Sequence, residues 1–164
     1  MSAHDDLVRW YYRGGRPNRV AAALNRLSAW LSSAGLAPSR MVTMEVRGRH
    51  SGRVLSFPLV VADHGGERYL VAMLGESTNW VRNVRASGGR AVLRHGRREA
   101  VRLEAVDPSE RAPIIKRYLA LAPGARPHIP VDRRAPLADF ERIADRYPVF
   151  CVRADAPGPS GERV

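Results

Sequence analysis

The chain has 164 residues, a hydrophobic content of 45% and a formal net charge of +11 at pH 7. Its length suits one domain with a sizeable core and is too short for two comfortable ones, and its composition excludes an intrinsically disordered chain. It contains no apolar run long enough to span a membrane, no signal-peptide core and a single cysteine, Cys151, so we expect a cytoplasmic protein without a disulfide.

Arginine accounts for almost all of the positive charge, since only Lys116 of the 27 basic residues is a lysine. Residues 7–44, 46–62 and 77–98 contain no acid and hold six, three and six arginines. This distribution predicts a basic surface built from the first two thirds of the chain, with a diffusely positive surface as the alternative. No nucleic-acid partner is expected, because the few aromatic residues are not spaced along a strand face for stacking on bases.

Residues 1–15 are weakly patterned and are predicted to form an N-terminal arm. From Pro17 onward, a helix is predicted by apolar residues that share one helical face: Val20, Ala23, Leu24, Leu27 and Leu31. Aromatic residues lie among the arginines at this end of the chain. Packing in the core is the favoured interpretation of these aromatics, and peripheral contact of the basic helix with the inner face of the membrane is the alternative.

Apolar and polar residues then alternate over three stretches that predict strands: 42–46, 55–61 and 69–73. The Gly65-Gly66 pair predicts a tight hairpin between the second and the third strand. Pro58 cannot donate a hydrogen bond to a neighbouring strand, so it predicts an edge or a bulge in the second strand.

The remaining elements follow after a short helix that is predicted over residues 77–87. Two further strands are predicted at 91–95 and 99–106. Asp107, with a proline next to it and a glutamate three residues on, predicts the start of a helix that runs to about Leu121. Another helix is predicted by four apolar residues that share one helical face: Leu137, Phe140, Ile143 and Ala144. A last strand is predicted at residues 148–154.

Six strands that are joined mostly by tight turns favour an antiparallel sheet closed into a barrel. The predicted fold class is therefore mainly β with flanking helices (α+β), with a barrel of about six strands. Residues 16–153 are expected to form this single domain together with the N-terminal helix, and residues 154–164 are expected to be a disordered tail. We expect a monomer.

Two short stretches carry residue types that suit the binding of an anion. In RGRHSGR, residues 47–53, two glycines let backbone N–H groups turn toward one point, and Ser51 adds a hydroxyl group. Arg49 and Arg53 add charge-assisted hydrogen bonds. This chemistry suits a phosphate or a carboxylate, and a solvated turn is the structural alternative.

The second stretch is GESTNWVRN, residues 75–83, at the start of the predicted short helix. Ser77 or Thr78 is its predicted N-cap, and the free N–H groups of a helix start form an anion site. Asn79 and Asn83 lie one turn apart with Trp80 between them, which suits a wall for a heteroaromatic ring; a helix cap and a core tryptophan are the alternatives. No motif for a metal, a nucleotide loop or a nucleophile occurs, so we expect no metal centre.

The two stretches occur in the order and at the distance found in a known family. The run TMEVRGRHSGRVLSFPL resembles the TxGRxSGxxxxxPL pattern of the deazaflavin-dependent nitroreductase family, and NWVRNVRASGGRAV resembles its later WxxNLxxxP stretch. The likeness covers residues 35–153. It implies an antiparallel split β-barrel that binds coenzyme F420, a deazaflavin with a phosphorylated, polyglutamylated tail. It also implies hydride transfer from the reduced coenzyme to a quinone, a nitroaromatic or a similar activated acceptor.

Under this resemblance, four positions match the motif for the phosphate and the tail: Arg49, Ser51, Gly52 and Arg53. Pro58 matches the proline beneath the ring. The helix start completes the expected coenzyme site: Ser77, Thr78, Asn79, Trp80 and Asn83. Glu76 is a departure, because it places a carboxylate where an anionic tail is expected.

Tyr118 and His128 are the candidate catalytic residues, as proton donors to the reduced acceptor, and a structural role is the alternative for each. Two other functions compete with the F420-dependent one. The first is an FMN-binding oxidoreductase on the same barrel, since FMN also offers a ring and a phosphate. The second is a non-catalytic binding module whose basic surface could bind nucleic acid.

Overall fold

The computed structural model describes residues 40–155, and the structural statements below concern this part of the chain. The predicted N-terminal arm, the predicted N-terminal helix and the predicted tail from residue 156 onward lie outside the described residues. Within residues 40–155, no helix has the length and the apolar character that crossing a membrane requires.

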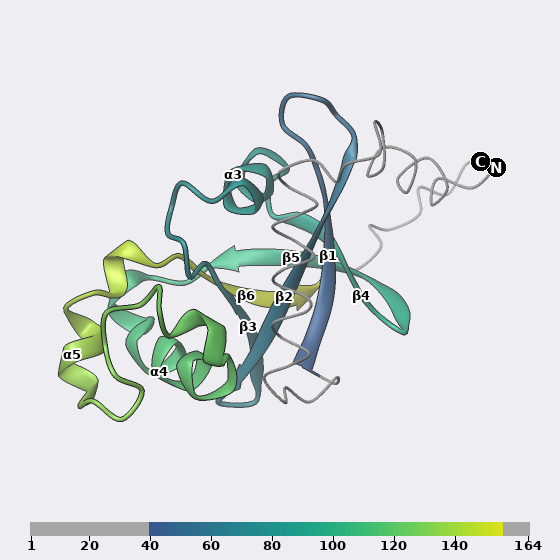
Figure 1. The fold of residues 1–164 in the computed structure, drawn as a ribbon. Coiled ribbons are helices and arrows are strands. Elements are labelled where there is room, and N and C mark those ends of the chain that lie inside the picture. The colour runs from purple at the N-terminus through teal and green to yellow at the C-terminus, as the bar shows by residue number, and fades with distance from the viewer. Residues whose placement is uncertain (1–39, 156–164) are drawn as a thin grey trace, which may run out of the picture.

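Six antiparallel strands close into a barrel (Figure 1). Around the barrel they follow the order β1-β2-β3-β6-β5-β4, and all neighbours run antiparallel. Their bounds are β1 (Met41–Arg47), β2 (Val54–His64), β3 (Glu67–Val71), β4 (Arg90–His95), β5 (Arg97–Ala105) and β6 (Val149–Ala154). The prediction of a mainly β fold with about six antiparallel strands and flanking helices is confirmed.

Gly65 and Gly66 form the turn between β2 and β3, as predicted. Their φ angles are +57° and +81°, and His64 pairs with Glu67 across the turn. A two-residue hairpin turn of this kind requires positive φ at both central positions, which glycine adopts without a steric penalty.

Pro58 lies on a free edge of β2. β1 pairs with β2 along its whole length and places Thr43 opposite Pro58, whereas β3 pairs with β2 only from Val61 to His64. Among the described strands, the first half of β2 therefore has no partner on its other side. Proline has no N–H to donate, so it fits this unpaired edge as predicted.

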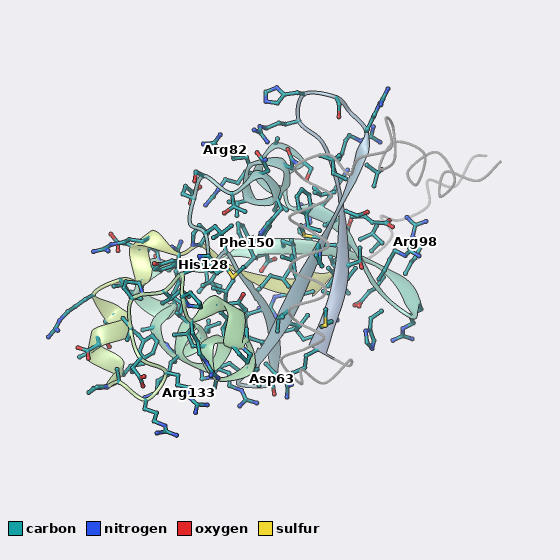
Figure 2. All side chains as sticks on the ribbon, in the orientation of Figure 1. Asp63, Arg82, Arg98, His128, Arg133 and Phe150 are labelled. Carbon is teal, nitrogen blue, oxygen red and sulfur yellow. The ribbon has the colours of Figure 1, made fainter. Side chains whose placement is uncertain are left out.

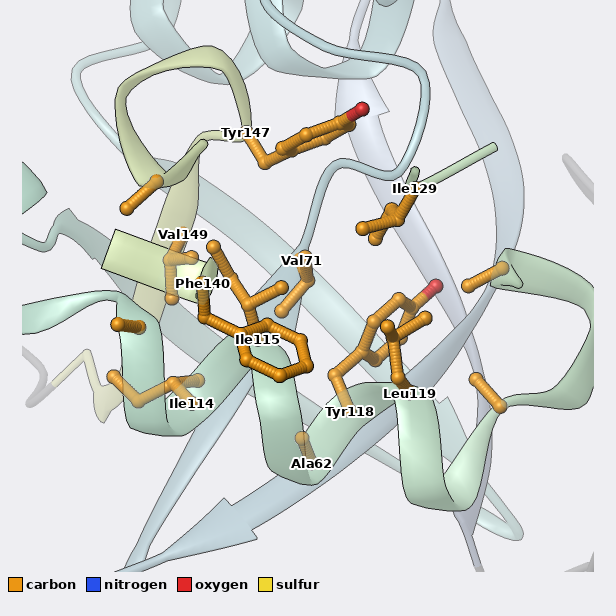
Figure 3. Packing of buried hydrophobic residues seen from close by; sticks show 14 of the residues in the cluster. Ala62, Val71, Ile114, Ile115, Tyr118, Leu119, Ile129, Phe140, Tyr147 and Val149 are labelled. Carbon is orange, nitrogen blue, oxygen red and sulfur yellow. The ribbon is translucent and has the colours of Figure 1, made fainter. Parts of the chain in front are cut away.

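Apolar side chains form two clusters, one inside the barrel and one outside it. The inner cluster includes the inward face of β1, where Val42, Met44 and Val46 alternate with more exposed residues as predicted. The outer cluster lies between β2 and β3 and the helix α4 (Ala112–Leu121), and Figure 3 shows its packing: Val60, Ala62, Val71, Ile115, Tyr118 and Leu119 are among its buried members. β2 supplies both clusters, since Leu59 and Val61 pack against the inner one. The apolar run of β2 thus requires cover on its outer face, and α4 supplies this cover.

The short helix α3 (Asn79–Ala86) lies within the predicted range of residues 77–87, follows β3 and is followed by the Gly88-Gly89 pair. The N–H of Gly89 donates to the carbonyl of Val84 at 2.9 Å, and the N–H of Gly88 donates to that of Arg85 at 3.3 Å. Buried Val81 and Val84 join α3 to the inner cluster. The helix therefore packs against the interior of the barrel and continues through two glycines directly into β4.

The helix predicted from Asp107 is interrupted. Asp107 caps as predicted, since its carboxylate accepts from the N–H of Ser109 at 2.9 Å, but Pro108–Glu110 form only a 3-10 turn, η2. The α-helix α4 begins at Ala112. Pro113 has no N–H to donate to the carbonyl of Ser109, so a continuous helix across this point would lack a hydrogen bond.

The helix predicted around Phe140 is shorter than expected. α5 (Leu137–Glu141) has five residues and is followed by the 3-10 turn η4 (Ala144–Arg146); another 3-10 turn, η3 (Pro123–Ala125), follows α4. Phe140, Ile143 and Ala144 are buried, but Leu137 is 41% exposed. The expectation that all four share one buried helical face is wrong, because the α-helix ends before residue 143.

Arg111 ties the start of α4 to the segment after α5. Its Nε donates to the carbonyl of Val106 at 2.8 Å, and its Nη1 donates to those of Ala144 at 3.3 Å and Tyr147 at 3.4 Å. Burial lowers the pKa of Arg111 from its usual value. Backbone carbonyls thus satisfy this buried cation and hold the chain that leads into β6.

An ion pair closes the hairpin end of the barrel. Arg68 comes just after the β2–β3 turn and Glu99 just after the β4–β5 turn, and they form two parallel hydrogen bonds of 3.0 and 2.7 Å. The Arg68 guanidinium holds the pKa of the Glu99 carboxyl below its usual value. The pair joins β3 to β5, which are not neighbours in the sheet.

Gly89→Ala is expected to destabilise the fold much more than Gly88→Ala. Both glycines have positive φ, +83° and +64°, which costs an alanine about 1–2 kcal/mol. A Cβ on Gly89 would also lie 2.6 Å from the carbonyl oxygen of Leu103, whereas one on Gly88 would meet nothing within 4 Å. Urea unfolding should show a loss of about 3 kcal/mol for Gly89→Ala and about 1 kcal/mol for Gly88→Ala; equal losses would contradict the close approach.

Glu99→Gln is expected to lower stability at neutral pH and to have less effect in acid. Because the folded-state pKa of Glu99 is lowered, its contribution is present above the ordinary glutamate pKa and is lost as the pH falls through the folded-state value. The difference in unfolding free energy between wild type and variant should therefore shrink between about pH 7 and about pH 3. A difference in unfolding free energy that grows on acidification would contradict a lowered pKa of Glu99 in the folded state.

Candidate functional site

The connection between β1 and β2 contains most of the RGRHSGR stretch and is closed by its own hydrogen bonds. The N–H of Gly48 donates to the carbonyl of Arg53 at 2.7 Å, and the N–H of Gly52 donates to that of Gly48 at 2.9 Å. The N–H of Arg53 donates to the Ser51 hydroxyl oxygen at 3.2 Å, and Arg47 Nη1 donates to the carbonyl of Gly52 at 3.0 Å. The stretch is therefore an internally bonded loop and not a free turn.

Both glycines of this loop are required by its geometry. Gly52 has a φ of +67°, a conformation that other residues rarely adopt. Gly48 is confined by its neighbours, since a Cβ there would lie 2.8 Å from the Ser51 hydroxyl oxygen and 3.3 Å from the Arg53 carbonyl oxygen. The glycine spacing thus compacts the loop and brings Arg49 and Arg53 onto one short segment.

Asn83 joins this loop to α3. Its side-chain oxygen accepts from the backbone N–H of Arg49 at 3.2 Å and from Arg49 Nη1 at 2.9 Å. Asn83 is 1% exposed. A buried amide oxygen needs hydrogen-bond partners, and Arg49 supplies two. The structure therefore brings together the two stretches that sequence analysis selected, through one residue of each.

The start of α3 differs from a helix capped by a side chain. Thr78 occupies the N-cap position, but its hydroxyl donates to the carbonyl of Gly75 at 2.6 Å and does not accept from the helix. Ser77 and Asn79 are exposed beside it. The first N–H groups of α3 thus have no side-chain cap, and Ser77, Thr78 and Asn79 lie around the helix start.

Trp80 lies in the inner cluster of the barrel. It is 4% exposed, and its ring centroid is 5.6 Å from that of Phe150, with the two planes tilted by 59°. This tilted arrangement is typical of packed aromatic pairs. The placement favours the core-packing alternative for Trp80 over a direct wall for a bound ring.

Glu76 is neutralised by a residue of the adjacent helix. Arg85 approaches the Glu76 carboxylate with Nε at 2.8 Å and with Nη2 at 3.1 Å. The Arg85 guanidinium also lies over the Phe150 ring, 5.6 Å from its centroid. The carboxylate that departs from the family pattern therefore has a cation of its own. Within residues 40–155, no ion pair joins a carboxylate to Arg49 or Arg53.

Several donors of the loop are not used within residues 40–155. The backbone N–H groups of His50 and Ser51, the hydrogen of the Ser51 hydroxyl and the Arg53 guanidinium have no recorded acceptor in this part of the chain. No carboxylate belongs to the loop itself. This donor set suits an anionic group such as a phosphate, because the loop offers both cationic and neutral donors and contains no carboxylate.

The other predicted site residues lie elsewhere. Pro58 is in the middle of β2, and Tyr118 is on α4, which Figure 1 shows well away from the β1–β2 loop. Tyr118 is 5% exposed, and its burial raises the pKa of its phenol. Figure 3 shows its ring beside Leu119, with the hydroxyl on the side of Ile129. Tyr118 is thus built into the outer cluster.

His128 is exposed, and its backbone carbonyl accepts from the Tyr147 hydroxyl at 3.0 Å. Figure 2 shows it between Arg82 and Arg133 along one side of the molecule. Its imidazole is therefore on the surface, while its backbone is held by the segment that precedes β6. Within residues 40–155, no group of three histidine, cysteine, aspartate or glutamate side chains could hold a metal ion.

Sequence reasoning missed Arg47 and Arg85. Arg47 lies outside the GRxSG core of the motif, and its role is a bond to a carbonyl within the loop. Arg85 lies nine residues after Glu76, and this spacing does not place two residues on the same face of a helix. The arginine enrichment of this region was the available signal, but it does not tell which guanidinium binds to the protein itself.

A sequence model of one family, described as F420H(2)-dependent quinone reductase, matches residues 23–137. No curated protein matches the chain.

Among solved structures, the chain is similar to an F420-H2 dependent reductase (FDR-A), with 23% identity, 70% of this chain and 94% of that chain covered, and a TM-score of 0.45. It is also similar to a protein of unknown function from Agrobacterium tumefaciens, with 16% identity, 70% of this chain and 48% of that chain covered, and a TM-score of 0.51. A third similar structure is that of a heme binding protein from Mycobacterium smegmatis, with 14% identity, 85% of this chain and 52% of that chain covered, and a TM-score of 0.48. These likenesses concern the fold.

Asn83→Leu is expected to release the loop from α3, because it removes the acceptor of both Arg49 bonds while keeping the size of the side chain. We expect trypsin to cut after the loop arginines faster than in the wild type, together with a loss of about 1–3 kcal/mol in unfolding free energy. Peptide mass spectrometry during limited proteolysis measures the first effect. Asn83→Asp is the control, since it keeps an acceptor oxygen facing Arg49; loop cleavage as fast as in Asn83→Leu would contradict the anchoring role.

Proposed function

The chain belongs to the F420H(2)-dependent quinone reductase family, and from this membership we propose that it reduces a quinone, a nitroaromatic or a similar activated acceptor. Membership makes the protein an oxidoreductase that has coenzyme F420 as its cofactor. When bound, the reduced coenzyme supplies the hydride. The acceptor and the roles of individual residues are our proposal.

The observation that carries the proposal is the bond between Asn83 and Arg49. It joins the basic loop to α3 with distances of 3.2 and 2.9 Å to one buried oxygen. A cradle for an anionic coenzyme must be held in place before binding, because ordering a loop on binding costs free energy. Internal bonds of the loop and its anchor on α3 meet this requirement.

We assign the anionic part of the coenzyme to the donors that the loop leaves unused. Arg53 and the N–H groups near Ser51 bind it directly, Arg49 contributes its remaining guanidinium hydrogens, and Gly52 keeps the loop compact. The helix start around Ser77, Thr78 and Asn79 adds the positive end of the α3 dipole. Glu76 does not oppose this arrangement, since Arg85 pairs with it.

We propose indirect roles for three further members of the predicted site. Asn83 positions Arg49, and Trp80 fixes α3 against Phe150 in the barrel interior. Pro58 keeps one edge of β2 free of strand pairing. These residues shape the site without reaching the coenzyme.

Of the two candidate proton donors, we retain His128. Its imidazole is exposed, so it can exchange protons with solvent and with an acceptor. Tyr118 is packed in the outer cluster, and burial raises its pKa, so we propose that it serves packing.

The expected monomeric state, the cytoplasmic location and peripheral membrane contact through the N-terminal helix stay predictions.

FMN also has a phosphate and a flat ring, so it is the comparison ligand for the same donors. A single pair of titrations separates the two. Protein fluorescence is followed as oxidised F420 or FMN is added. We expect F420 to quench the fluorescence with a dissociation constant on the order of 10 μM. Binding of FMN without binding of F420 would contradict the assignment of F420 to these donors.

Arg53→Ala is expected to weaken F420 binding by about tenfold or more, because a charge-assisted hydrogen bond to an anion contributes about 1.5–3 kcal/mol. No effect on stability is expected, since the Arg53 guanidinium has no recorded partner within residues 40–155. Arg134→Ala, which removes an exposed arginine close to α5, is the matched control. Equal affinities for both variants would remove Arg53 from the site.

A further inference from the structure

The pairing of the strands aligns three outward-facing arginines in one row. Arg90 on β4 is directly opposite Arg102 on β5. Glu45 on β1 is opposite Val92 on β4 in an antiparallel ladder, so two residues further along both strands Arg47 comes next to Arg90. The strand residues beside these arginines belong to the inner cluster, and the three side chains therefore point away from the barrel interior. We call Arg47, Arg90 and Arg102 the arginine row.

The arginine row is not neutralised by the described part of the protein. Arg90 and Arg102 are like charges in directly opposite positions, an arrangement that destabilises a sheet. Within residues 40–155, the one carboxylate paired with the row is Asp155, whose oxygen is 3.7 Å from Arg102. Arg47 uses Nη1 for a carbonyl of the β1–β2 loop and has no carboxylate partner in this range. Folding stability does not require three arginines here, and their charge suits an anion from outside the chain.

The row has a defined length. The next position across the sheet is Arg153 on β6, opposite Arg102. Arg153 is paired with two carboxylates, Glu67 at 2.8 Å and Glu104 at 3.4 Å. Adjacent strands lie about 5 Å apart, so the three arginines that keep their charge span about 10 Å. The positive row therefore starts at β1 and ends at β5.

One end of the row is the loop to which we assign the anionic part of the coenzyme. Arg47 is the last residue of β1 and directly precedes this loop. Asn83 fixes the loop on α3, and Arg102 Nη1 donates to the carbonyl of Gly88, just after α3, at 3.4 Å. Figure 1 shows α3 and the β1–β2 loop at the same end of the barrel. The loop and the arginine row thus form one continuous positively charged surface.

Resting on the proposed function, we propose that the arginine row binds the glutamyl tail of coenzyme F420 and makes the protein prefer coenzyme with a long tail. The phosphate is assigned to the β1–β2 loop, and the tail continues from the phosphate as a chain of carboxylates. Each guanidinium fork fits a carboxylate with two hydrogen bonds. A single glutamate cannot meet three cations that span about 10 Å, so only longer tails use the whole row.

The gain from each contact is modest, because the row lies at the surface. Arg47 and Arg90 are exposed, and the side chain of Arg102 is 43% exposed. One exposed ion pair changes an equilibrium constant by at most about fivefold. We therefore expect several such contacts to make the binding of long-tail coenzyme about tenfold tighter than the binding of single-glutamate coenzyme.

The test compares the affinity of the full chain for two forms of oxidised F420, one with a single glutamate and one with several. Dissociation constants are measured from the quenching of protein fluorescence. The wild type should bind the long-tail form about tenfold more tightly at about 0.05 M salt, and this preference should disappear at about 0.5 M salt. The double variant Arg90→Gln, Arg102→Gln should reduce the preference to about twofold. Its affinity for the single-glutamate form should stay close to that of the wild type, which shows that the variant is folded.

A matched pair of arginines on the same two strands provides the control. Arg94 and Arg98 are also directly opposite each other, but Glu45 accepts from both, at 3.0 and 2.7 Å. They lie four residues along the strands from the row, about 13 Å away. Arg94→Gln, Arg98→Gln removes the same charge and should keep the full preference for the long tail. Arg90→Lys, Arg102→Lys keeps the charge of the row and should retain most of the preference.

Two results would overturn the assignment of the tail to the row. Equal affinities of the wild type for both forms at low salt would show that the tail gains nothing from the protein. An equal loss of preference in Arg94→Gln, Arg98→Gln would show that total charge acts without a defined row. Both results leave the proposed function in place, whereas failure of the wild type to bind either form would overturn the proposed function and the role of the row with it.

Discussion

The arrangement of the site depends on one buried amide oxygen. Asn83 is 1% exposed, and an unpaired polar atom at such a position would cost about 1–3 kcal/mol. Its two partners, the backbone N–H and the guanidinium of Arg49, lie 34 residues earlier in the chain. Satisfying this one atom therefore fixes the basic loop on α3, and it connects the stability of the barrel to the geometry of the β1–β2 loop.

A second constraint comes from β2, which is apolar on both faces. Leu59 and Val61 pack toward the barrel interior, while Val60 and Ala62 pack under α4. Both faces must leave water, so α4 lies across the outside of the sheet. This location draws Tyr118 into a packed cluster away from the β1–β2 loop. The packed side of the barrel is therefore separate from the loop, whose remaining donors have no acceptor within residues 40–155.

The excess of arginine is divided among distinct environments. Arg111 is buried and bound by backbone carbonyls, and Arg68 closes the hairpin end of the barrel with Glu99. Near the loop, Arg85 neutralises Glu76. The net charge of +11 therefore does not describe one diffuse surface. Some guanidinium groups stabilise the fold, and others remain at the loop and on the outer face of β4 and β5.

The sequence by itself determined what depends on neighbouring residues. Alternation gave the inward face of β1, Gly65-Gly66 gave the hairpin, Asp107 gave a cap, and the order of the motifs indicated the family. Tertiary structure alone decided the pairing of β3 with β6, the bond between Asn83 and Arg49, and the exposure of Leu137. Periodicity and turn chemistry act over a few residues, so a single sequence shows them. Long-range contacts are chosen by the burial and hydrogen bonding of the whole barrel, which no local pattern contains.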